Sequence, residues 1–462
     1  MIRLFKHYIP HAVLLMMILD FLALLGAGEL AWNVRAKQIG MDVGPVTGRM
    51  APLLSFALAL QLAMISVGVY GVEALQSIRF ATARLLTAVS LGVIFLSVMN
   101  FILPGSTLWR SNSLYAMAFA IIALLAVRVL LGRLLGGEAF RRRIVVLGAG
   151  KRANRILELS NRKTSGFSAV GFIAMSEAPP VVPEAIRRTN IESLADHVVK
   201  LGATEVVLAL EERRGSLPLA DLLRIKTTGV HVNDISSFLE RETGRVDLDT
   251  VNPSWFIFSD GFTAGRRLST AAKRMFDIAA SLAVLLLTFP LIILFAIIVK
   301  LDSPGPAFYR QQRVGLYRQP YNIIKIRSMR QDAEAGGKAI WASKGDPRVT
   351  RVGQLIRKLR IDELPQLWCV LKGEMSFVGP RPERPEFVAE LEQQIPYYAE
   401  RHMVKPGLTG WAQINYPYGA SIDDARQKLE YDLYYAKNYT LFLDLLILMQ
   451  TLRVLLWPDG AR

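Results

Sequence analysis

Asp362 and Glu363 are adjacent carboxylates in the segment 360–367, and Pro365 follows two residues after the pair. In such a pair, one carboxylate can attack a phosphorus atom while its neighbour holds a metal ion. The structural alternative is a helix start, with Asp362 as the N-cap residue and Pro365 in the first turn. The pair alone favours the helix start, so its interpretation depends on the residues around it.

Cationic side chains lie on both sides of this pair in the sequence. Lys325 and Arg327 precede it, Arg381 follows it between two prolines, and a segment rich in glycine and proline occupies 405–415. Guanidinium and ammonium groups bind phosphate oxygens through charge-assisted hydrogen bonds. The combination indicates phosphate chemistry rather than a helix cap.

Composition indicates a membrane-associated protein. The chain has 462 residues, of which 52% are hydrophobic, and this length predicts two or three domains. The net charge of +16 indicates an anionic partner, and basic residues beside apolar helices favour a membrane surface over nucleic acid. The single cysteine, Cys369, excludes an internal disulfide. The five histidines have no metal-ligand spacing, so we expect any metal to be bound by oxygen.

Four apolar stretches in the first third predict four transmembrane helices, at about 9–32, 51–72, 85–103 and 114–131. The first stretch lacks a small-residue cleavage site, so we expect it to be retained. Basic residues flank the group at both ends and place both ends in the cytoplasm: Arg3, Lys6, Arg133, Arg141, Arg142 and Arg143. Asp20 and Arg128 lie within apolar stretches, where we favour interhelical pairing or snorkelling over a transport path.

Residues 144–150 predict a buried strand that runs into a glycine turn and a helix. Apolar runs at 169–174 and 205–209 alternate with helical stretches, which predicts a small parallel α/β domain. Gly148 and Gly150 resemble part of a dinucleotide-binding fingerprint and are weak candidates for cofactor binding. Because no acidic residue stands out roughly twenty residues later, a regulatory or spacer domain is favoured.

The segment 271–300 allows two membrane topologies. Its apolar core is long enough to span, but Pro290 lies near the middle, with Lys273 and Arg274 before the core and Lys300 after it. A spanning helix would put the basic C-terminal part outside the cell. A helix broken at Pro290 could instead enter one leaflet and return, which keeps both flanks in the cytoplasm.

From about 271 to 462 the chain resembles the bacterial sugar transferases, the monotopic phosphoglycosyl transferases that act on a polyprenyl phosphate. The motifs that carry the resemblance are residues 308–315, 325–329, 362–367, 375–382 and 405–410. Four helices and a nucleotide-binding-like domain ahead of this region resemble the large members of the family. Residues 1–8, 259–262, 382–387 and 416–419 look closest to the exopolysaccharide subfamily associated with the exosortase (PEP-CTERM) system.

The resemblance implies a two-step exchange at the bacterial inner (cytoplasmic) membrane. Asp362 would attack the β-phosphorus of a UDP-sugar and release UMP, and a polyprenyl (undecaprenyl) phosphate would then take the sugar phosphate from the aspartyl intermediate. Glu363 would hold Mg²⁺, and three cations would bind phosphate: Arg381, Lys325 and Arg327. The resemblance also implies a homodimer and a re-entrant helix at 271–300. The family usually has serine before the helix-breaking proline, whereas this chain has Phe289 before Pro290.

The predicted fold is a membrane protein with three parts and a linker. Residues 1–135 form a four-helix transmembrane bundle, 140–240 a Rossmann-like α/β domain, 241–270 a linker, and 271–462 a mostly α catalytic domain with the re-entrant helix. The predicted partners are a UDP-sugar, polyprenyl phosphate and membrane lipid. Two other hypotheses remain open, a nucleotide-sensing membrane module and a flippase or assembly scaffold. The transferred sugar is not determined: glucose, galactose and acetamido sugars all remain candidates.

Overall fold

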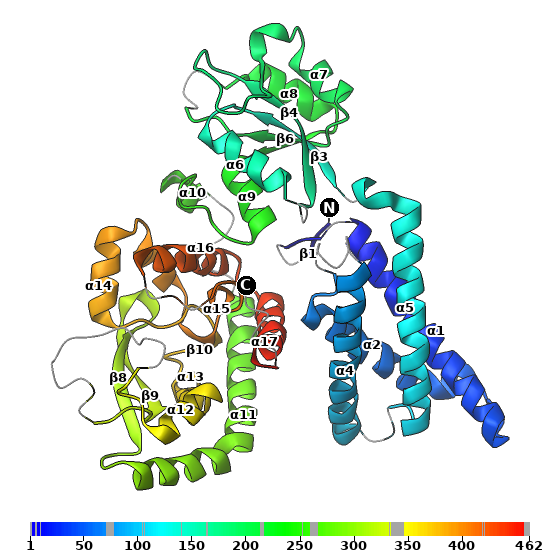
Figure 1. The fold of residues 1–462 in the computed structure, drawn as a ribbon, viewed down its shortest axis with the longest axis vertical. Helices are drawn as coiled ribbons and strands as arrows, with labels where there is room; N and C mark the ends of the chain where they lie inside the picture. Colours follow the sequence, from blue (N-terminus) through cyan, green and yellow to red (C-terminus); the bar gives the residue numbers. More distant parts are fainter. Residues whose placement is uncertain are drawn as a thin grey trace. The chain divides into compact units, whose positions relative to one another are not determined.

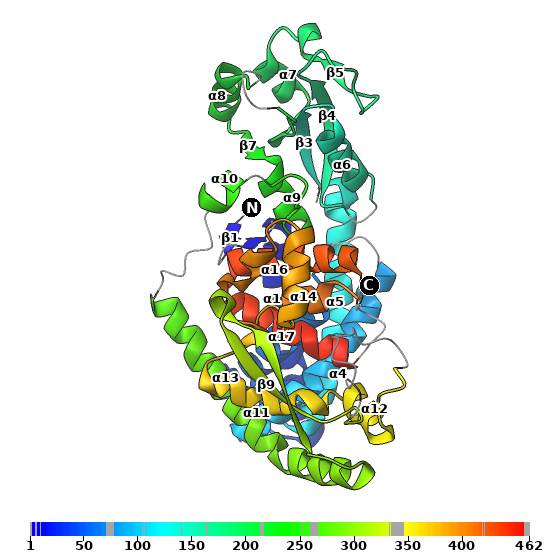
Figure 2. The same cartoon turned by 90° about the vertical axis from the view of Figure 1, so that its left-hand side faces the viewer.

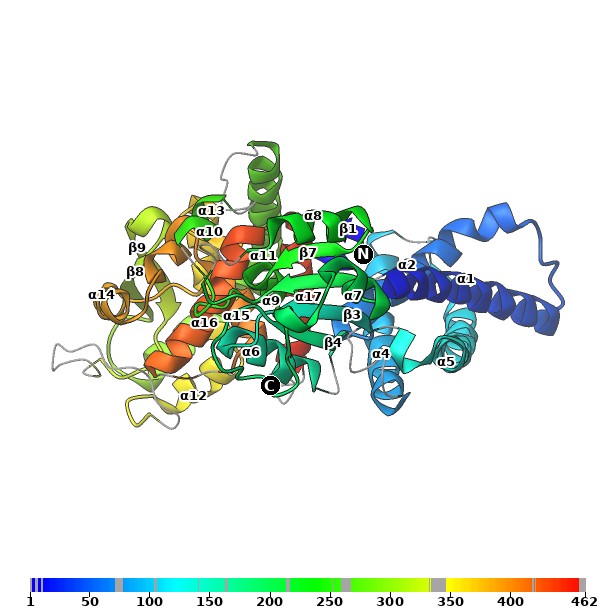
Figure 3. The same cartoon turned by 90° about the horizontal axis from the view of Figure 1, so that it is seen from above.

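The computed structural model describes residues 2–4, 7–9, 11–70, 78–103, 105, 107–139, 141–162, 165–212, 217–251, 253–258, 267–331, 333, 346–417, 419 and 421–456. The chain divides into two compact units, Met1–Glu242 and Thr243–Arg462. Figures 1, 2 and 3 show the elements of both units. Of the segments that indicate the exopolysaccharide subfamily, 259–262 lies outside the described residues, and 1–8 and 416–419 lie partly outside them.

The first unit begins with a short hairpin, β1 (Ile2–Leu4) and β2 (His7–Ile9), and then four long helices. The helices are α1 (His11–Ile39), α2 (Met50–Val67, after the turn η1 at Val46–Arg49), α4 (Ile78–Ile102) and α5 (Arg110–Ala139). The helices pack together: α1 contacts both α2 and α5, and α4 also contacts both α2 and α5. Each contains a segment long and apolar enough to cross a membrane. The predicted apolar helices of a membrane protein are therefore confirmed.

An ion pair links α1 to α5 inside this helical group. Arg128 donates to both carboxylate oxygens of Asp20, at 3.0 and 2.8 Å. The side chains are 4% and 0% exposed, so each charge is compensated by the other away from water. The expected interhelical pairing of these residues is confirmed.

A parallel sheet follows, with strand order β5-β4-β3-β6-β7. Its strands are β3 (Arg142–Leu147), β4 (Phe167–Ala174), β5 (Ile186–Arg187), β6 (Glu205–Leu208) and β7 (His231–Asp234). Between them lie α6 (Lys151–Ser160), η2 (Arg188–Asn190), α7 (Leu194–Lys200) and α8 (Leu219–Thr227), and α9 (Ile235–Thr243) ends the domain. This arrangement confirms the predicted small parallel sheet.

Both faces of the sheet are buried, which explains the continuous apolar run in β3. Ile144 and Val146 face one core with α6 and α9, whereas Val145 and Leu147 face a second core with α7 and α8. Successive side chains of a strand point to opposite faces, so one run of residues supplies both cores.

The second unit begins with α10 (Pro253–Phe258) and the long helix α11 (Arg267–Asp302). An antiparallel hairpin follows, β8 (Phe308–Val314) and β9 (Pro320–Ile326), with η3 (Leu316–Arg318) between its strands. The next elements are α12 (Arg351–Lys358), η4 (Ile361–Gln366), α13 (Leu367–Lys372) and β10 (Ser376–Val378). The unit ends with α14 (Pro385–Gln394), η5 (Tyr398–Met403), β11 (Gly407–Thr409, parallel to β10), α15 (Trp411–Asn415), α16 (Ile422–Asn438) and α17 (Leu441–Leu456).

Helix α11 contains Pro290 and bends sharply part-way along its length (Figures 1 and 2). A proline inside a helix removes one backbone hydrogen bond and clashes with the preceding turn, so Pro290 accounts for the bend. The side chain of Phe289 has no hydrogen-bond donor, but the hydroxyl of Thr288 donates to the carbonyl oxygen of Val284 at 2.7 Å. Such a side-chain bond to the previous turn also favours bending.

Most of the apolar surface of α11 is not covered by protein. The segment Thr270–Asp302 has a mean hydropathy of 3.1 in its most apolar window, of which 11% is buried. Ile292 and Val299 are exceptions, because they pack against Ile356 of α12 and Ile361 of η4. The exposed remainder indicates a helix that lies in lipid. The re-entrant topology itself stays a prediction.

Candidate functional site

Asp362 lies in the short 3-10 helix η4 rather than at the start of an α-helix. Arg360 precedes η4 with φ of 57°, a left-handed conformation that turns the chain sharply after α12. No side chain caps the start of η4, so Asp362 is not the N-cap residue. The carboxylate pair does lie in the first turn of a helix, η4, but the expected N-cap role of Asp362 is wrong, because Arg360 occupies that position.

Asp362 is a buried carboxylate with an uncommitted oxygen. The residue is 8% exposed, and its Oδ1 atom has no hydrogen-bond partner within the part of the chain that the structure describes. Burial raises the pKa of Asp362 above its ordinary value, and the negative charge of Glu363 raises it further. Because buried acceptors are almost always paired, this oxygen is suited to a partner that arrives with a substrate.

Glu363 is held by positive charges that come from three different segments. Its Oε1 atom lies 2.8 Å from a guanidinium nitrogen of Arg381, 3.3 Å from Nζ of Lys325 and 3.8 Å from Arg360. Burial on its own would raise the pKa of Glu363, but these cations outweigh burial and hold that pKa well below its ordinary value. Glu363 is therefore ionised at neutral pH.

The structure thus brings together Lys325, Arg381 and the carboxylate pair. Lys325 lies on β9, which packs against η4, and Arg381 lies in the loop that follows β10. On the same hairpin Ile323 is buried against Val370 of α13 and Met375, which fixes β9 relative to the helix after η4. Burial lowers the pKa of Lys325, while the charge of Glu363 opposes that effect.

Arg327 lies at a different place from the other predicted phosphate ligands. Its guanidinium donates to Ser303 O at 2.7 Å, to Ser303 Oγ at 3.0 Å and to the carbonyl oxygen of Pro304. These groups follow the last turn of α11, where carbonyl oxygens lack partners within the helix. Arg327 is 6% exposed and committed to this helix end. We therefore correct the prediction: within the described part of the chain, the hydrogen bonds of Arg327 go to the end of α11 rather than to the carboxylate pair.

Two cations near Asp362 were missed by the sequence analysis. Arg357, on α12, and Arg360 both lower the pKa of Asp362 through their positive charge. Arg357 is half-buried, and Arg360 is exposed. The available signal was the presence of three basic residues within 357–360, one residue before the carboxylate pair.

Glu363 also fits the predicted Mg²⁺. Among the described residues there is no group of three His, Cys, Asp or Glu side chains that could hold a metal by themselves. Mg²⁺, however, keeps several waters and is often bound by one or two carboxylates together with substrate phosphates. The ionised Glu363 would match that donor set together with substrate phosphates, which leaves Asp362 free to act as the nucleophile.

The glycine turn of the α/β domain holds one of the protein's own carboxylates. Gly148 has φ of 131°, and a Cβ atom there would lie 2.4 Å from Ala209 O. At the start of α6, the backbone N–H of Lys151 donates to Glu211 Oε1 at 2.7 Å. A phosphate bound at this helix N-terminus would have to displace Glu211. Cofactor binding at Gly148 and Gly150 stays a prediction, without support from this geometry.

Two further polar or aromatic residues, Asp432 and Trp411, have structural contacts. Asp432 is 2% exposed and accepts two hydrogen bonds from Arg401, at 2.7 and 3.1 Å. Trp411 is an aromatic anchor, because it donates from Nε1 to Gly244 O at 2.7 Å and stacks on Tyr434.

The site combines an available carboxylate, an ionised neighbour and cations suited to phosphate beside an apolar helix, which is typical of a membrane-associated phosphotransferase. The family described as bacterial sugar transferase matches residues 268–458. With the relatives described below, this match shows that the chain belongs to the bacterial sugar transferase family.

Three similar proteins illustrate the range of the family. An undecaprenyl-phosphate galactose phosphotransferase of Salmonella typhimurium is 30% identical over 400 residues, 80% of each chain. A UDP-N-acetylgalactosamine-undecaprenyl-phosphate N-acetylgalactosaminephosphotransferase of Aeromonas hydrophila is 44% identical over 241 residues, 52% of this chain and 56% of that protein. An undecaprenyl-phosphate glucose phosphotransferase of Komagataeibacter xylinus is 34% identical over 324 residues, 68% of this chain. The matched region spans 58% of the Komagataeibacter protein.

The assignment of Arg327 predicts a difference in stability between two arginine variants. Arg327→Ala removes the hydrogen bonds of a buried guanidinium to Ser303 and Pro304 at the end of α11, so we expect the free energy of unfolding to fall by about 1–3 kcal/mol. Arg381→Ala, at a side chain that is 35% exposed, should change it less, because Lys325 and Arg360 still compensate the charge of Glu363. Thermal unfolding of both variants in detergent measures the difference. Equal stability of Arg327→Ala and the unmodified protein would contradict the assignment.

Proposed function

We propose that this protein transfers a sugar 1-phosphate from a UDP-sugar to undecaprenyl phosphate through a covalent aspartyl intermediate, releasing UMP. The reaction would begin the synthesis of an exopolysaccharide or a similar surface glycan. The observation that carries the proposal is the buried, uncommitted Oδ1 atom of Asp362 beside a Glu363 that is held by Lys325 and Arg381.

In the first step, Asp362 attacks the β-phosphorus of the donor. A bond forms between the carboxylate oxygen and phosphorus, and the bond from phosphorus to the bridging oxygen breaks, so that UMP leaves with the electron pair. Arg381 and Lys325 bind diphosphate oxygens and stabilise the charge that moves onto UMP. Mg²⁺ bound with Glu363 would supply further neutralisation of the diphosphate.

In the second step, a phosphate oxygen of the lipid attacks the phosphorus of the intermediate and releases the carboxylate of Asp362. We assign Arg357 to this lipid phosphate. It lies beside Ile356, which packs against the apolar helix α11, and Leu355 and Leu359 of the same segment are 48% and 56% exposed. A cation next to exposed apolar side chains suits a phosphate at the membrane surface.

The membrane arrangement forms part of the same proposal. Helix α11 enters one leaflet, bends at Pro290 and returns, while the four N-terminal helices span the bacterial inner membrane with both ends in the cytoplasm. The site then faces cytosolic nucleotide sugar and lies at headgroup level. We retain the predicted division into 1–135, 140–240, 241–270 and 271–462, and a homodimer as an expectation from the family.

The donor sugar is left to experiment. The three relatives are named for galactose, N-acetylgalactosamine and glucose, so these UDP-sugars form the donor panel. The nucleotide-sensing hypothesis is not favoured, because Glu211 holds the helix N-terminus where a phosphate would bind.

Replacing the nucleophile should abolish transfer. With Mg²⁺, undecaprenyl phosphate and the donor panel, we expect UMP release by Asp362→Asn to fall by at least about 10³-fold, because the amide cannot attack phosphorus. The matched control is Asp423→Asn, at an exposed residue in the first turn of α16, which should stay near full activity. Comparable UMP release by the two variants would refute the role of Asp362.

The dependence of the rate on pH should follow the ionisation of Asp362. Arg360→Gln removes a positive charge that lowers the pKa of Asp362, so that pKa should rise and the reactive carboxylate should form only at higher pH. We expect the acidic limb of the profile of kcat/KM against pH to move to higher pH, and the same change at exposed Arg351 to leave it in place. A limb that stays fixed or moves to lower pH in Arg360→Gln would contradict the assignment.

The topology of α11 can be tested with cysteine labels at its two ends. In a Cys369→Ser background, Thr270→Cys and Lys300→Cys place thiols at exposed positions before and after Pro290. If the helix re-enters, a membrane-impermeant maleimide should label both positions in inverted vesicles and neither in intact spheroplasts. Labelling of the two positions from opposite sides would show a spanning helix instead.

A further inference from the structure

The loop that carries Arg381 is anchored through its carbonyl groups. Residues 380–382, here called the Pro-Arg-Pro segment, have no helix or strand structure. Two of its three residues are prolines, which have no N–H to donate, so carbonyl oxygens are the main points at which its backbone can be held. All three carbonyls accept hydrogen bonds: Pro380 from Gly407 N at 2.9 Å, Arg381 from Arg401 at 3.0 Å and Pro382 from Arg313 at 3.2 Å.

Arg401 is fixed in place by its other contacts. Its side chain is 5% exposed. Asp432 accepts from its Nε and one terminal nitrogen, and Tyr398 Oη accepts from the other terminal nitrogen at 3.0 Å. A planar guanidinium whose nitrogens are all used has little freedom to turn, so it is a rigid donor to the Arg381 carbonyl.

Arg313, from the motif at 308–315, donates to the carbonyl of Pro382, the next residue of the segment. It lies on β8, donates to Gln311 Oε1 at 2.6 Å and lies 3.7 Å from the carboxylate of Glu383. Burial lowers the pKa of Arg313 from its ordinary value. The hairpin that supplies Lys325 to the site therefore also supplies a donor to the Pro-Arg-Pro segment.

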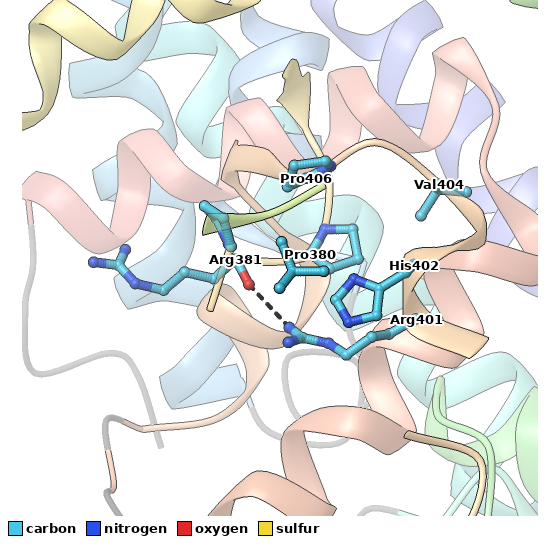
Figure 4. A pocket seen from close by; sticks show the side chains of 8 residues that line it. Pro380, Arg381, Arg401, His402, Val404 and Pro406 are labelled. Atoms are coloured by element: carbon cyan, nitrogen blue, oxygen red, sulfur yellow. Dashed lines mark hydrogen bonds between the residues drawn. The ribbon is translucent and has the colours of Figure 1, made fainter. Parts of the chain in front are cut away.

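The two ends of Arg381 point in different directions. Figure 4 shows its carbonyl oxygen directed at Arg401, while its side chain extends to the other side of the segment. That side chain reaches Glu363 at 2.8 Å and is 35% exposed. A long, half-exposed side chain adopts one orientation only if its backbone is held, and small displacements of a charge that stabilises a reaction are costly.

We propose that Arg401 and Arg313 are positioning residues for Arg381: they fix the Pro-Arg-Pro segment so that the Arg381 guanidinium meets the donor diphosphate beside Glu363. The inference rests on the proposed function, since it concerns the same transfer reaction. Neither residue touches substrate in this account; each acts through the backbone of Arg381.

A double-mutant cycle tests this indirect action. Arg401→Lys keeps the positive charge beside Asp432 but loses the forked donor geometry, and Arg381→Ala removes the guanidinium while its backbone carbonyl remains. We expect Arg401→Lys to lower kcat/KM for the UDP-sugar by about tenfold or more in the unmodified protein and by less than about twofold in the Arg381→Ala background. UMP release measures the rates, and thermal unfolding in detergent checks that each variant is folded.

Arg245→Lys is the matched control, because Arg245 also pairs with a buried carboxylate of α16, Glu430, at 3.3 Å, whereas the three carbonyls of the Pro-Arg-Pro segment accept from Gly407, Arg401 and Arg313. It should leave kcat/KM within about twofold of the unmodified protein. Arg313→Lys should repeat the pattern of Arg401→Lys at the neighbouring carbonyl, and it supplies the cycle if Arg401→Lys does not fold.

Equal losses from Arg401→Lys with and without the Arg381 side chain would overturn the inference and indicate a general structural role. An equal loss from Arg245→Lys would overturn it as well. A failure of the proposed function would look different: the unmodified protein would release no UMP with any donor. That result would overturn both proposals together.

Discussion

Glu363 forms ion pairs with cations from three segments of the C-terminal unit that are separate in the sequence. A carboxylate removed from water costs several kcal/mol unless opposite charges compensate it, and here a strand, a left-handed turn and a proline-flanked loop each supply one cation to the same oxygen. The positions of these segments therefore depend on one another. This arrangement leaves Asp362 available to react, because the nearest cations pair with Glu363 and the Oδ1 atom of Asp362 has no hydrogen-bond partner among the described residues.

The same unit connects this charged site to an apolar helix. Arg327 follows Lys325 by two residues and binds the carbonyl groups after α11, so one strand end serves both the site and the helix. Ile361, one residue before Asp362, packs with Ile292 and Val299 of α11. A transfer between a water-soluble donor and a lipid acceptor requires such proximity, because both substrates must reach one phosphorus atom.

Much of this organisation could be predicted from local sequence. Apolar run length predicts the long helices, and the continuous apolar run in β3 reflects two buried faces. Pro290 explains a bend that the helix pattern alone would not contain. The residue types of the carboxylate pair, Lys325 and Arg381 suit phosphate chemistry, and the structure brings them together.

The errors and omissions arose where a side chain's partner is distant in sequence. Arg327 has the residue type of a phosphate ligand, but it binds carbonyls more than twenty residues earlier, a contact that only the fold determines. Glu211 reaches the start of α6 across 60 residues, and Arg401 reaches Asp432 across 31. The left-handed turn at Arg360 was also not predictable, since neither glycine nor asparagine marks it.

The central claim is that Asp362 forms a covalent bond to the sugar phosphate. The most direct test is the mass of the intact protein and its peptides after incubation with Mg²⁺ and each UDP-sugar, without a lipid acceptor. The account predicts a gain of one sugar phosphate, located on the peptide that contains Asp362 and lost when undecaprenyl phosphate is added. If no protein adduct forms before undecaprenyl phosphate is added, and the lipid product forms after it is added, the transfer is direct and the account is contradicted.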